Sequence, residues 1–326
     1  MGAVKALRCR ECGAEYPPSR QYVCSECFGA LEVIYDYNLT RFSPSELESR
    51  PKSLWRYFEL LPVFNKHNAI DLSTGFTPLQ KADNLAKALG VRRVYIKNDT
   101  LTPTGSFKDR PASVAVSKAL ELGFEAVGCA STGNLAAATA AHAAKAGLSC
   151  YVFAPKYIEF GKVLQAAAYG AKIIAVENTF DDANRLAVQA AEKFNLGIVN
   201  VNIRPYYVEG SKTLAFEVAE QLGWKTPDRV IAPIASGALL TSLYKGFLEL
   251  KLFDLVDEIP MITGAQPSGC APVSNAFKRG YSKVIPVEKP NTIAKGLAIG
   301  DPSYGTYALK AAEKTGGVID DVSDPE

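Results

Sequence analysis

The sequence lacks the features of membrane, secreted and nucleic-acid-binding proteins. No run of about 18 apolar residues occurs in its 326 residues, so we expect no membrane-spanning helix. Residues 1–7 contain no apolar signal core, which favours a cytoplasmic protein. The 36 basic and 34 acidic residues give a net charge of +2 without a basic run, so neither nucleic acid nor a membrane surface is an expected partner. A small molecule is favoured instead.

The length and composition predict a chain that folds throughout. With 326 residues it exceeds the usual size of one hydrophobic core, so we expect two domains and a small additional segment. Hydrophobic residues make up 48% and charged residues 21% of the chain, which leaves little room for long disordered tracts.

Seven cysteines in a cytoplasmic protein do not predict a disulfide framework, because intracellular thiols are kept reduced. Four of them form two C-x2-C pairs separated by eleven residues, namely Cys9, Cys12, Cys24 and Cys27. Two such pairs can supply four thiolates to one tetrahedral Zn²⁺, and a site with four protein ligands is structural. The alternative is four unrelated thiols. Residues 31–37 are predicted to form a strand that closes this small ribbon.

From residue 91 onward, short β-rich runs alternate with alanine-rich helical runs. Strands are expected at 93–97, 126–130, 150–154, 172–176, 197–201 and 229–234, with helices after Lys108 and at 135–146, 161–169, 181–194 and 209–222. This alternation predicts an α/β fold of parallel sheets covered by helices on both faces. Ligands should then lie at the carboxyl ends of the strands, against helix N-termini.

Lys108 stands just inside a predicted helix, in the run "TGSFKD". The positive end of the helix dipole disfavours a cation there. A lysine that acts as a nucleophile or forms a Schiff base benefits from these surroundings, because positive potential and partial burial favour the neutral amine. The alternative is an ordinary solvated lysine.

Two further loops at helix starts are suited to anions. "STGN" (131–134) offers free backbone amides and two hydroxyls to a carboxylate, and Asn134 could hydrogen-bond a cofactor oxygen. The hydroxyls could instead serve only as helix caps. "ASGA" (235–238) has small side chains that let backbone amides approach a phosphate. Neither the Walker pattern nor G-x-G-x-x-G is present there.

Together these loops and Lys108 would accommodate one phosphate, one carboxylate and one aldehyde. That set describes pyridoxal phosphate with an amino-acid substrate.

Seven motifs of the chain resemble threonine synthase. They are "LSTGFTPL" (72–79), "GSFKDR" (105–110), "CASTGNLAAA" (129–138), "RPYYVEGSKTLAFEVAEQLGW" (204–224), "PIASGALLTSLYKGF" (233–247), "GAQPSGCAPVSNAF" (264–277) and "PNTIAKGLAIGDP" (290–302). They occur in the family's order, and part of the family carries a zinc-ribbon-like segment at its N-terminus. The resemblance implies a fold-type II pyridoxal-phosphate enzyme with two doubly wound α/β domains. We therefore expect a zinc-ribbon-like segment at 1–38, a larger cofactor domain from 39–112 and 203–326, and a smaller α/β domain at 113–202.

The resemblance also implies roles for individual residues. Lys108 corresponds to the Schiff-base lysine and Asn134 to the residue that binds the 3′-oxygen of the pyridine ring. The substrate-carboxylate loop corresponds to Ser131, Thr132 and Gly133, and the phosphate cup to Ala235, Ser236, Gly237, Ala238 and Leu239. Additional donors for a substrate phosphate could be Thr104, Arg110, Arg204 and Lys212, each of which could otherwise be a surface charge or a cap.

By the same resemblance, the chain would be a carbon–oxygen lyase that converts O-phospho-L-homoserine and water to L-threonine and phosphate, the last step of threonine biosynthesis. A homodimer is usual in this family. Two alternatives stay open. One is a threonine or serine dehydratase on the same scaffold, and the other is a non-catalytic protein that binds a partner through its zinc ribbon.

One family element is missing from the printed sequence. Family members carry a "TG-x-GLK" element whose Thr or Ser faces the pyridine nitrogen, whereas the 326 residues end at "VIDDVSDPE". Either the sequence is a truncated form or the partner of the pyridine nitrogen comes from elsewhere. We favour truncation, and expect this form to bind the cofactor less tightly than a longer form.

Overall fold

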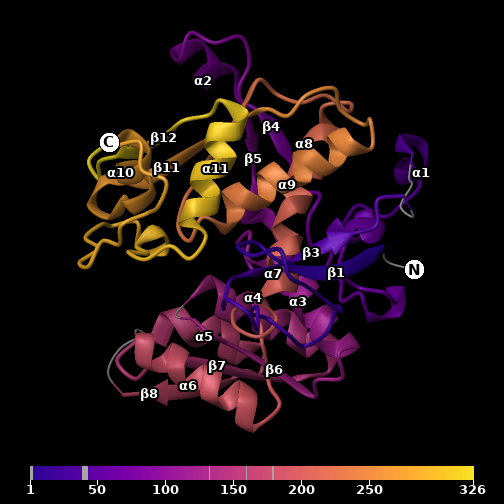
Figure 1. The fold of residues 1–326 in the computed structure, drawn as a ribbon, viewed down its shortest axis with the longest axis vertical. Helices are drawn as coiled ribbons and strands as arrows, with labels where there is room; N and C mark the ends of the chain where they lie inside the picture. Colours follow the sequence, from indigo (N-terminus) through magenta and orange to yellow (C-terminus); the bar gives the residue numbers. More distant parts are fainter. Residues whose placement is uncertain (1–2, 39–42, 132, 159, 178–179) are drawn as a thin grey trace. The chain divides into compact units, whose positions relative to one another are not determined.

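The computed structural model describes residues 3–38, 43–131, 133–158, 160–177 and 180–326. It divides into two compact units, Met1–Gly210 and Ser211–Glu326 (Figure 1). No helix in the described ranges is both long and apolar enough to cross a bilayer. The expected division into a ribbon and two interleaved domains stays a prediction.

The first unit carries three sheets and most of the helices. Its strands are β1 (Val4–Cys9), β2 (Glu15–Tyr16), β3 (Leu31–Tyr35), β4 (Leu79–Lys81), β5 (Tyr95–Lys97), β6 (Ala126–Ala130), β7 (Ser149–Pro155), β8 (Lys172–Val176) and β9 (Gly197–Ile198). Its helices are α1 (Pro44–Glu48), α2 (Asp83–Ala88), α3 (Asp109–Glu121), α4 (Asn134–Ala146), α5 (Phe160–Ala168), α6 (Phe180–Lys193) and α7 (Arg204–Tyr207). β1 pairs antiparallel with β2 and β3, which forms the ribbon predicted at the N-terminus.

The main sheet of this unit is parallel, with the strand order β8-β7-β6-β9. From β6 the chain runs outward through α4 to β7 and through α5 to β8, and then returns through α6 to β9. Because crossovers between parallel strands are right-handed, reversing the direction places α6 on the opposite face from α4 and α5. The carboxyl ends of β6 and β9 therefore form the switch point at which such sheets bind ligands.

Small side chains let the helices lie close to this sheet. In α4 the alanines Ala136, Ala138 and Ala140 are fully buried. On the side of α6, Ala183 and Ala187 belong to a buried cluster that includes Phe153 and Ile198. Alanine is the best helix former and loses no side-chain entropy on burial, so these runs favour close-packed helices.

The second unit is built on one parallel sheet with the order β10-β11-β12. Its elements are α8 (Thr213–Gln221), β10 (Arg229–Pro233), α9 (Ala238–Leu252), β11 (Met261–Pro267), α10 (Pro272–Lys278), α11 (Gly305–Thr315) and β12 (Ile319–Val322). In Figure 1, α9 lies between α8 and α11, and it packs against both. Gly246 permits the close contact with α8, because a Cβ atom there would lie 2.6 Å from the carbonyl oxygen of Lys212.

Most predicted elements are found, with three corrections. The strands expected at 126–130 and 172–176 have these bounds in β6 and β8, and the α/β fold class is confirmed. The strand expected at 93–97 is shorter and pairs antiparallel with β4, not in a parallel sheet. The strand expected at 197–201 ends at Ile198, because Asn202 bonds back to the backbone of Ile198 and Leu196. The helix expected at 209–222 begins at Thr213, after a 3-10 turn at Val208–Lys212.

Candidate active site

Lys108 is the last residue before helix α3, as the sequence predicted. Its side chain is half-buried, with the amine 4.6 Å from the centre of the Phe107 ring. The Nζ atom lies 3.4 Å from the hydroxyl of Tyr207, at the end of α7. Among the described residues no carboxylate forms an ion pair with this amine. Sequence reasoning missed Tyr207, although "RPYYVEG" was among the motifs it singled out.

The loop before Lys108 is held by internal hydrogen bonds. The Thr102 hydroxyl donates to the carbonyl of Ser106 at 2.7 Å and accepts from its amide at 2.9 Å. The Thr104 amide and hydroxyl both donate to Oδ2 of Asp109, at 2.8 and 3.0 Å. The Thr104 hydroxyl, predicted to bind a substrate phosphate, therefore has a carboxylate partner in this structure.

Arg110 makes a buried ion pair rather than facing open solvent. Its Nε and Nη2 atoms bind the two oxygens of Asp99 at 2.7 and 2.8 Å, and Nη2 also donates to the Thr77 hydroxyl at 3.2 Å. Burial alone would raise the pKa of Asp99, but the hydrogen bonds and charge of Arg110 outweigh it and hold that pKa below its usual value. The ion pair of Arg110 and Asp99 thus connects the start of α3 with Thr77, which bonds to both side chains.

Next to Lys108, Asp109 takes part in a second buried network, with His142 on α4. The Nδ1 atom of His142 donates to the carbonyl of Ala138 at 2.9 Å, and Nε2 accepts from the Thr74 hydroxyl at 3.0 Å. Burial lowers the pKa of His142, so the ring is neutral. The Oδ1 atom of Asp109 lies 3.8 Å from Nδ1 and has no hydrogen-bond partner among the described residues. Three segments with family-like motifs thus meet at His142.

The "STGN" loop leaves the carboxyl end of β6 at the switch point of the main sheet. Ser131 is half-buried, and α4 begins at Asn134 with Gly133 as its N-cap and no side-chain cap from a described residue. Thr132 lies outside the described residues. From the turn after β9, Asn200 holds the loop by bonding both the amide and the carbonyl of Ala130 at 3.2 Å. The amides at the start of α4 are therefore suited to an anion.

In the second unit, the segment 235–239 joins β10 to α9. Gly237 is the N-cap of this 15-residue helix and has a φ of 87°. A Cβ atom at Gly237 would lie 2.6 Å from the carbonyl oxygen of Tyr304, and the Tyr304 amide donates to the carbonyl of Ser236 at 2.8 Å. The Ser236 hydroxyl accepts a long hydrogen bond, at 3.5 Å, from the amide of Ala238, the first residue of α9. Ala235, Ala238 and Leu239 are each partly exposed. The loop therefore has small side chains, and Gly237 gives it a conformation that favours glycine.

The remaining predicted phosphate donors, Arg204 and Lys212, belong to different units. Lys212, in the second unit, is fully buried, and its amine lies 2.9 Å from the carboxylate of Glu249. Arg204, in the first unit, begins α7 ahead of Pro205. The phosphate-binding roles of Arg204 and Lys212 stay predictions.

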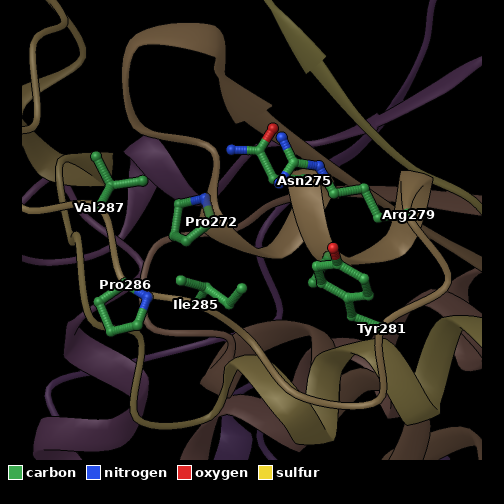
Figure 2. A pocket seen from close by; sticks show the side chains of 8 residues that line it. Pro272, Asn275, Arg279, Tyr281, Ile285, Pro286 and Val287 are labelled. Atoms are coloured by element: carbon green, nitrogen blue, oxygen red, sulfur yellow. The ribbon is translucent and has the colours of Figure 1, made fainter.

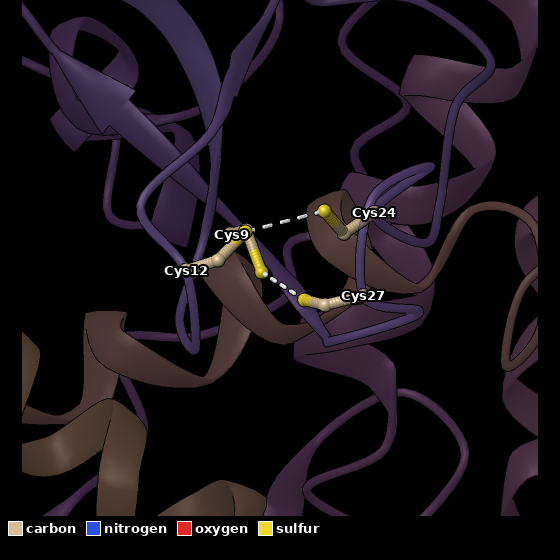
Figure 3. Close-up of side chains that lie close together, drawn as sticks. All are labelled: Cys9, Cys12, Cys24 and Cys27. Carbon is tan, nitrogen blue, oxygen red and sulfur yellow. Dashed lines mark hydrogen bonds between the residues drawn. The ribbon is translucent and has the colours of Figure 1, made fainter.

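The four cysteines of the ribbon converge as their spacing predicted. Their sulfur atoms all lie within 4.8 Å of one another. Figure 3 shows the short contacts, which are 3.5 Å between Cys9 and Cys27 and between Cys12 and Cys24. The Tyr16 hydroxyl lies 3.1 Å from the sulfur of Cys24, and this hydrogen bond lowers the pKa of Cys24 to about 6. Four thiols at this separation fit one tetrahedral metal ion.

A small hollow occurs elsewhere in the second unit (Figure 2). It is formed by α10 and the segment after it, and is lined by Pro272, Asn275, Ala276, Arg279, Tyr281, Ile285, Pro286 and Val287. None of the predicted site residues lines it.

Comparison with known proteins assigns the family. Residues 70–326 match the family of pyridoxal-phosphate-dependent enzymes. The threonine synthase of Methanosarcina acetivorans is 42% identical over 322 residues, which cover 98% of this chain and 79% of that protein. The threonine synthase of Methanocaldococcus jannaschii has the same identity and coverage. The chain belongs to the threonine synthase family.

A bacterial threonine synthase is also similar in sequence, and enzymes of other names share the fold. The threonine synthase of Mycobacterium tuberculosis is 39% identical over 278 residues, 85% of this chain and 74% of that protein. Among solved structures, a fungal L-serine ammonia-lyase from Rhizomucor miehei has a TM-score of 0.66 at 23% identity, covering 77% of this chain and 76% of that one. Maize serine racemase has a TM-score of 0.65 at 23% identity, covering 77% and 72%. These two likenesses show the fold alone.

The residues present fit the cofactor of the threonine synthase family. A lysine amine without an ion pair among the described residues can attach an aldehyde. The N-terminus of the 15-residue helix α9, with Gly237 as its N-cap, can offer backbone amides to a phosphate. Lys108 belongs to the first compact unit and the start of α9 to the second.

Proposed function

We propose that the chain catalyses the threonine synthase reaction, in which O-phospho-L-homoserine and water give L-threonine and inorganic phosphate. The observation that carries the proposal is 42% identity over 98% of the chain to a threonine synthase. Relatives of that name reach 39–42% identity, whereas the likenesses to a serine ammonia-lyase and a serine racemase are at 23%. This difference favours threonine synthase over a dehydratase on the same scaffold.

Lys108 is the proposed attachment point of pyridoxal phosphate, which supplies an electron sink for charge that develops at the substrate's Cα. When it is not attached to the cofactor, the Lys108 amine would serve as the base for the Cα proton. Its half-buried position directly before α3, where no carboxylate among the described residues pairs with the amine, supports this role.

The other binding roles follow from helix starts. The loop of Ser131, Thr132 and Gly133 would hold the substrate carboxylate, and Asn134 the 3′-oxygen of the cofactor. The segment 235–239 would hold the cofactor phosphate through amides of α9. Support comes from the N-termini of α4 and α9, each of which has a glycine as its N-cap residue.

Donors to the substrate phosphate are proposed among Thr104, Arg110, Arg204 and Lys212. Arg110 and Lys212 face the carboxylates of Asp99 and Glu249. Binding a phosphate through either one would therefore require an exchange of ion-pair partners, which is costly for buried charges.

We also propose that Cys9, Cys12, Cys24 and Cys27 hold one structural Zn²⁺. The closeness of their four sulfur atoms supports this. A homodimer and a cytoplasmic location are proposed from the family resemblance and the sequence composition.

The test is covalent trapping followed by turnover. The chain is incubated with pyridoxal phosphate, reduced with borohydride and digested, and a pyridoxyl group is expected on Lys108 and absent from Lys108→Ala. Phosphate release from O-phospho-L-homoserine is then compared with keto-acid release from threonine. Modification at other lysines only, or keto acid as the sole product, would refute the proposal.

A further inference from the structure

The loop between the two cysteine pairs reaches the short helix α7. Ser19 stands between Cys12 and Cys24, and its carbonyl oxygen accepts a hydrogen bond from the Tyr206 hydroxyl at 2.6 Å. Tyr206 is fully buried, and burial raises the pKa of its phenol, so the hydroxyl keeps the proton that it donates. This bond joins positions 187 residues apart in the sequence.

The neighbouring residue on α7 points to the proposed active-site lysine. Tyr207 is almost fully buried, and its hydroxyl lies 3.4 Å from Nζ of Lys108. Helix α7 is four residues long and continues directly into the 3-10 turn Val208–Lys212, where the Glu209 carboxylate accepts from the Tyr35 hydroxyl of β3 at 2.8 Å. It packs on α3 and on β3 of the ribbon. The contact of Tyr206 with Ser19 therefore helps to set where Tyr207 lies.

The same loop also touches the far end of α3. The Nε and Nη2 atoms of Arg20 donate to the carbonyl of Leu122, the C-cap of α3, at 3.2 and 2.6 Å. The guanidinium lies 4.2 Å from the centre of the Phe124 ring and donates to Asn195. A cation at this end is favourable for the helix dipole. Helix α3 begins directly after Lys108. The loop therefore contacts both α3, which carries the lysine at its start, and α7, which carries Tyr207.

We propose that the four-cysteine segment positions the active-site lysine. Through Ser19 and Arg20 it fixes α7 and α3, and Tyr207 then holds the Lys108 amine in one orientation. A lysine side chain has much rotamer freedom, and a fixed hydrogen-bond partner removes part of it before the cofactor arrives. Tyr207 contacts the reacting amine, whereas Tyr206 and Arg20 are positioning residues. The inference rests on the proposed function for the attachment of pyridoxal phosphate to Lys108.

The experiment measures the rate of covalent attachment at Lys108 as a function of pyridoxal phosphate concentration, by borohydride trapping and mass spectrometry of the peptide. Tyr207→Phe is expected to lower the saturating rate constant roughly 2- to 10-fold, the effect of one lost hydrogen bond, at an unchanged half-saturating concentration. Tyr151→Phe is the matched control, because its hydroxyl also accepts from a lysine, Lys172, at 3.4 Å, but on an exposed surface. The control is expected to react like the wild type.

A double-mutant cycle tests the role of the ribbon. Tyr206→Phe is expected to slow attachment in the wild-type background and to add nothing in a Tyr207→Phe background, because both act through one contact. If Tyr206→Phe unfolds, as judged by circular dichroism, Arg20→Ala tests the contact with α3 instead, and attachment at the wild-type rate in that variant would overturn the inference.

Three outcomes are distinguishable. If the wild type attaches no cofactor at Lys108, the proposed function fails. If it does attach there and Tyr207→Phe reacts at the wild-type rate, the inference fails alone. Additive effects of the two tyrosine substitutions would also overturn it, because they would show that the ribbon does not act through Tyr207.

Discussion

Replacing Asp99 by asparagine should destabilise the first unit strongly. The substitution removes the negative charge that faces the guanidinium of Arg110 across 2.7 Å, while the shape of the side chain stays the same. The Arg110 side chain is fully buried and that of Asp99 is 13% exposed, so water screens little of the change. Removing one partner of such a pair costs about 3 kcal/mol or more.

The chain offers a local reporter for this measurement. The indole nitrogen of Trp55 donates to the Ser113 hydroxyl on α3 at 3.0 Å, and the other tryptophan, Trp224, belongs to the second unit. In a Trp224→Phe background, fluorescence therefore follows unfolding near α3. The urea midpoint is expected to fall by about 1 M or more for Asp99→Asn.

The matched control is Asp83→Asn. It breaks the exposed pair of Lys81 and Asp83, whose side chains are 53% and 72% exposed, and should change the midpoint little because water screens exposed pairs. An equal shift for the two variants would refute the reasoning.

The pH dependence of this difference has a definite sign. The pKa of Asp99 is lower in the folded chain than its usual value. Its stabilisation is therefore complete above the unfolded pKa of about 3.9 and is lost as pH falls towards the folded pKa. The difference in unfolding free energy between the wild type and Asp99→Asn should be constant near neutral pH and decrease only below about pH 4.

Three further predictions concern other parts of the chain. Gly237→Ala should weaken pyridoxal phosphate binding roughly tenfold or more, measured by fluorescence titration, because its Cβ atom would lie 2.6 Å from the Tyr304 carbonyl oxygen at a φ of 87°; unchanged affinity would contradict the phosphate role of this loop. Purified chain should hold about one zinc ion and Cys24→Ser far less by atomic absorption, whereas equal metal content would count against the four-thiolate site. Because burial lowers the pKa of His142, the unfolding free energy should rise with pH below about 6.5, and the same slope in His142→Gln would assign it to another group.

Local patterns were sufficient where local chemistry decides the structure. The runs at 126–130 and 172–176 are β-rich, stand between helices, and form β6 and β8 with the predicted bounds. The C-x2-C spacing brought four thiols together because each pair is a tight turn and the ribbon strands β1 and β3 pair directly. The N-terminal ends of α3 and α4 fall within one residue of their predicted places for the same reason.

The second unit contains elements that the sequence did not predict. β11 includes Gly264 and Pro267, residues that disfavour strands. Gly264 is needed in this strand because Ile234 packs closely against it. A Cβ atom at this position would lie 2.2 Å from the isoleucine Cδ1. Tertiary packing thus overrides the local preference, and a single-sequence pattern contains no sign of it.

The same distinction explains which site residues could be inferred. Lys108 and the anion loops are marked by their own helix starts, so their neighbours in sequence identify them. The ion-pair partners of Arg110 and Lys212 are not marked in this way, since Asp99 precedes by 11 residues and Glu249 follows by 37. A pattern can show that a charged side chain is present, but only the fold decides which carboxylate reaches it. Tyr207 is the extreme case, because its contact with Lys108 spans 99 residues and depends on an α7 that is itself held from the N-terminal ribbon.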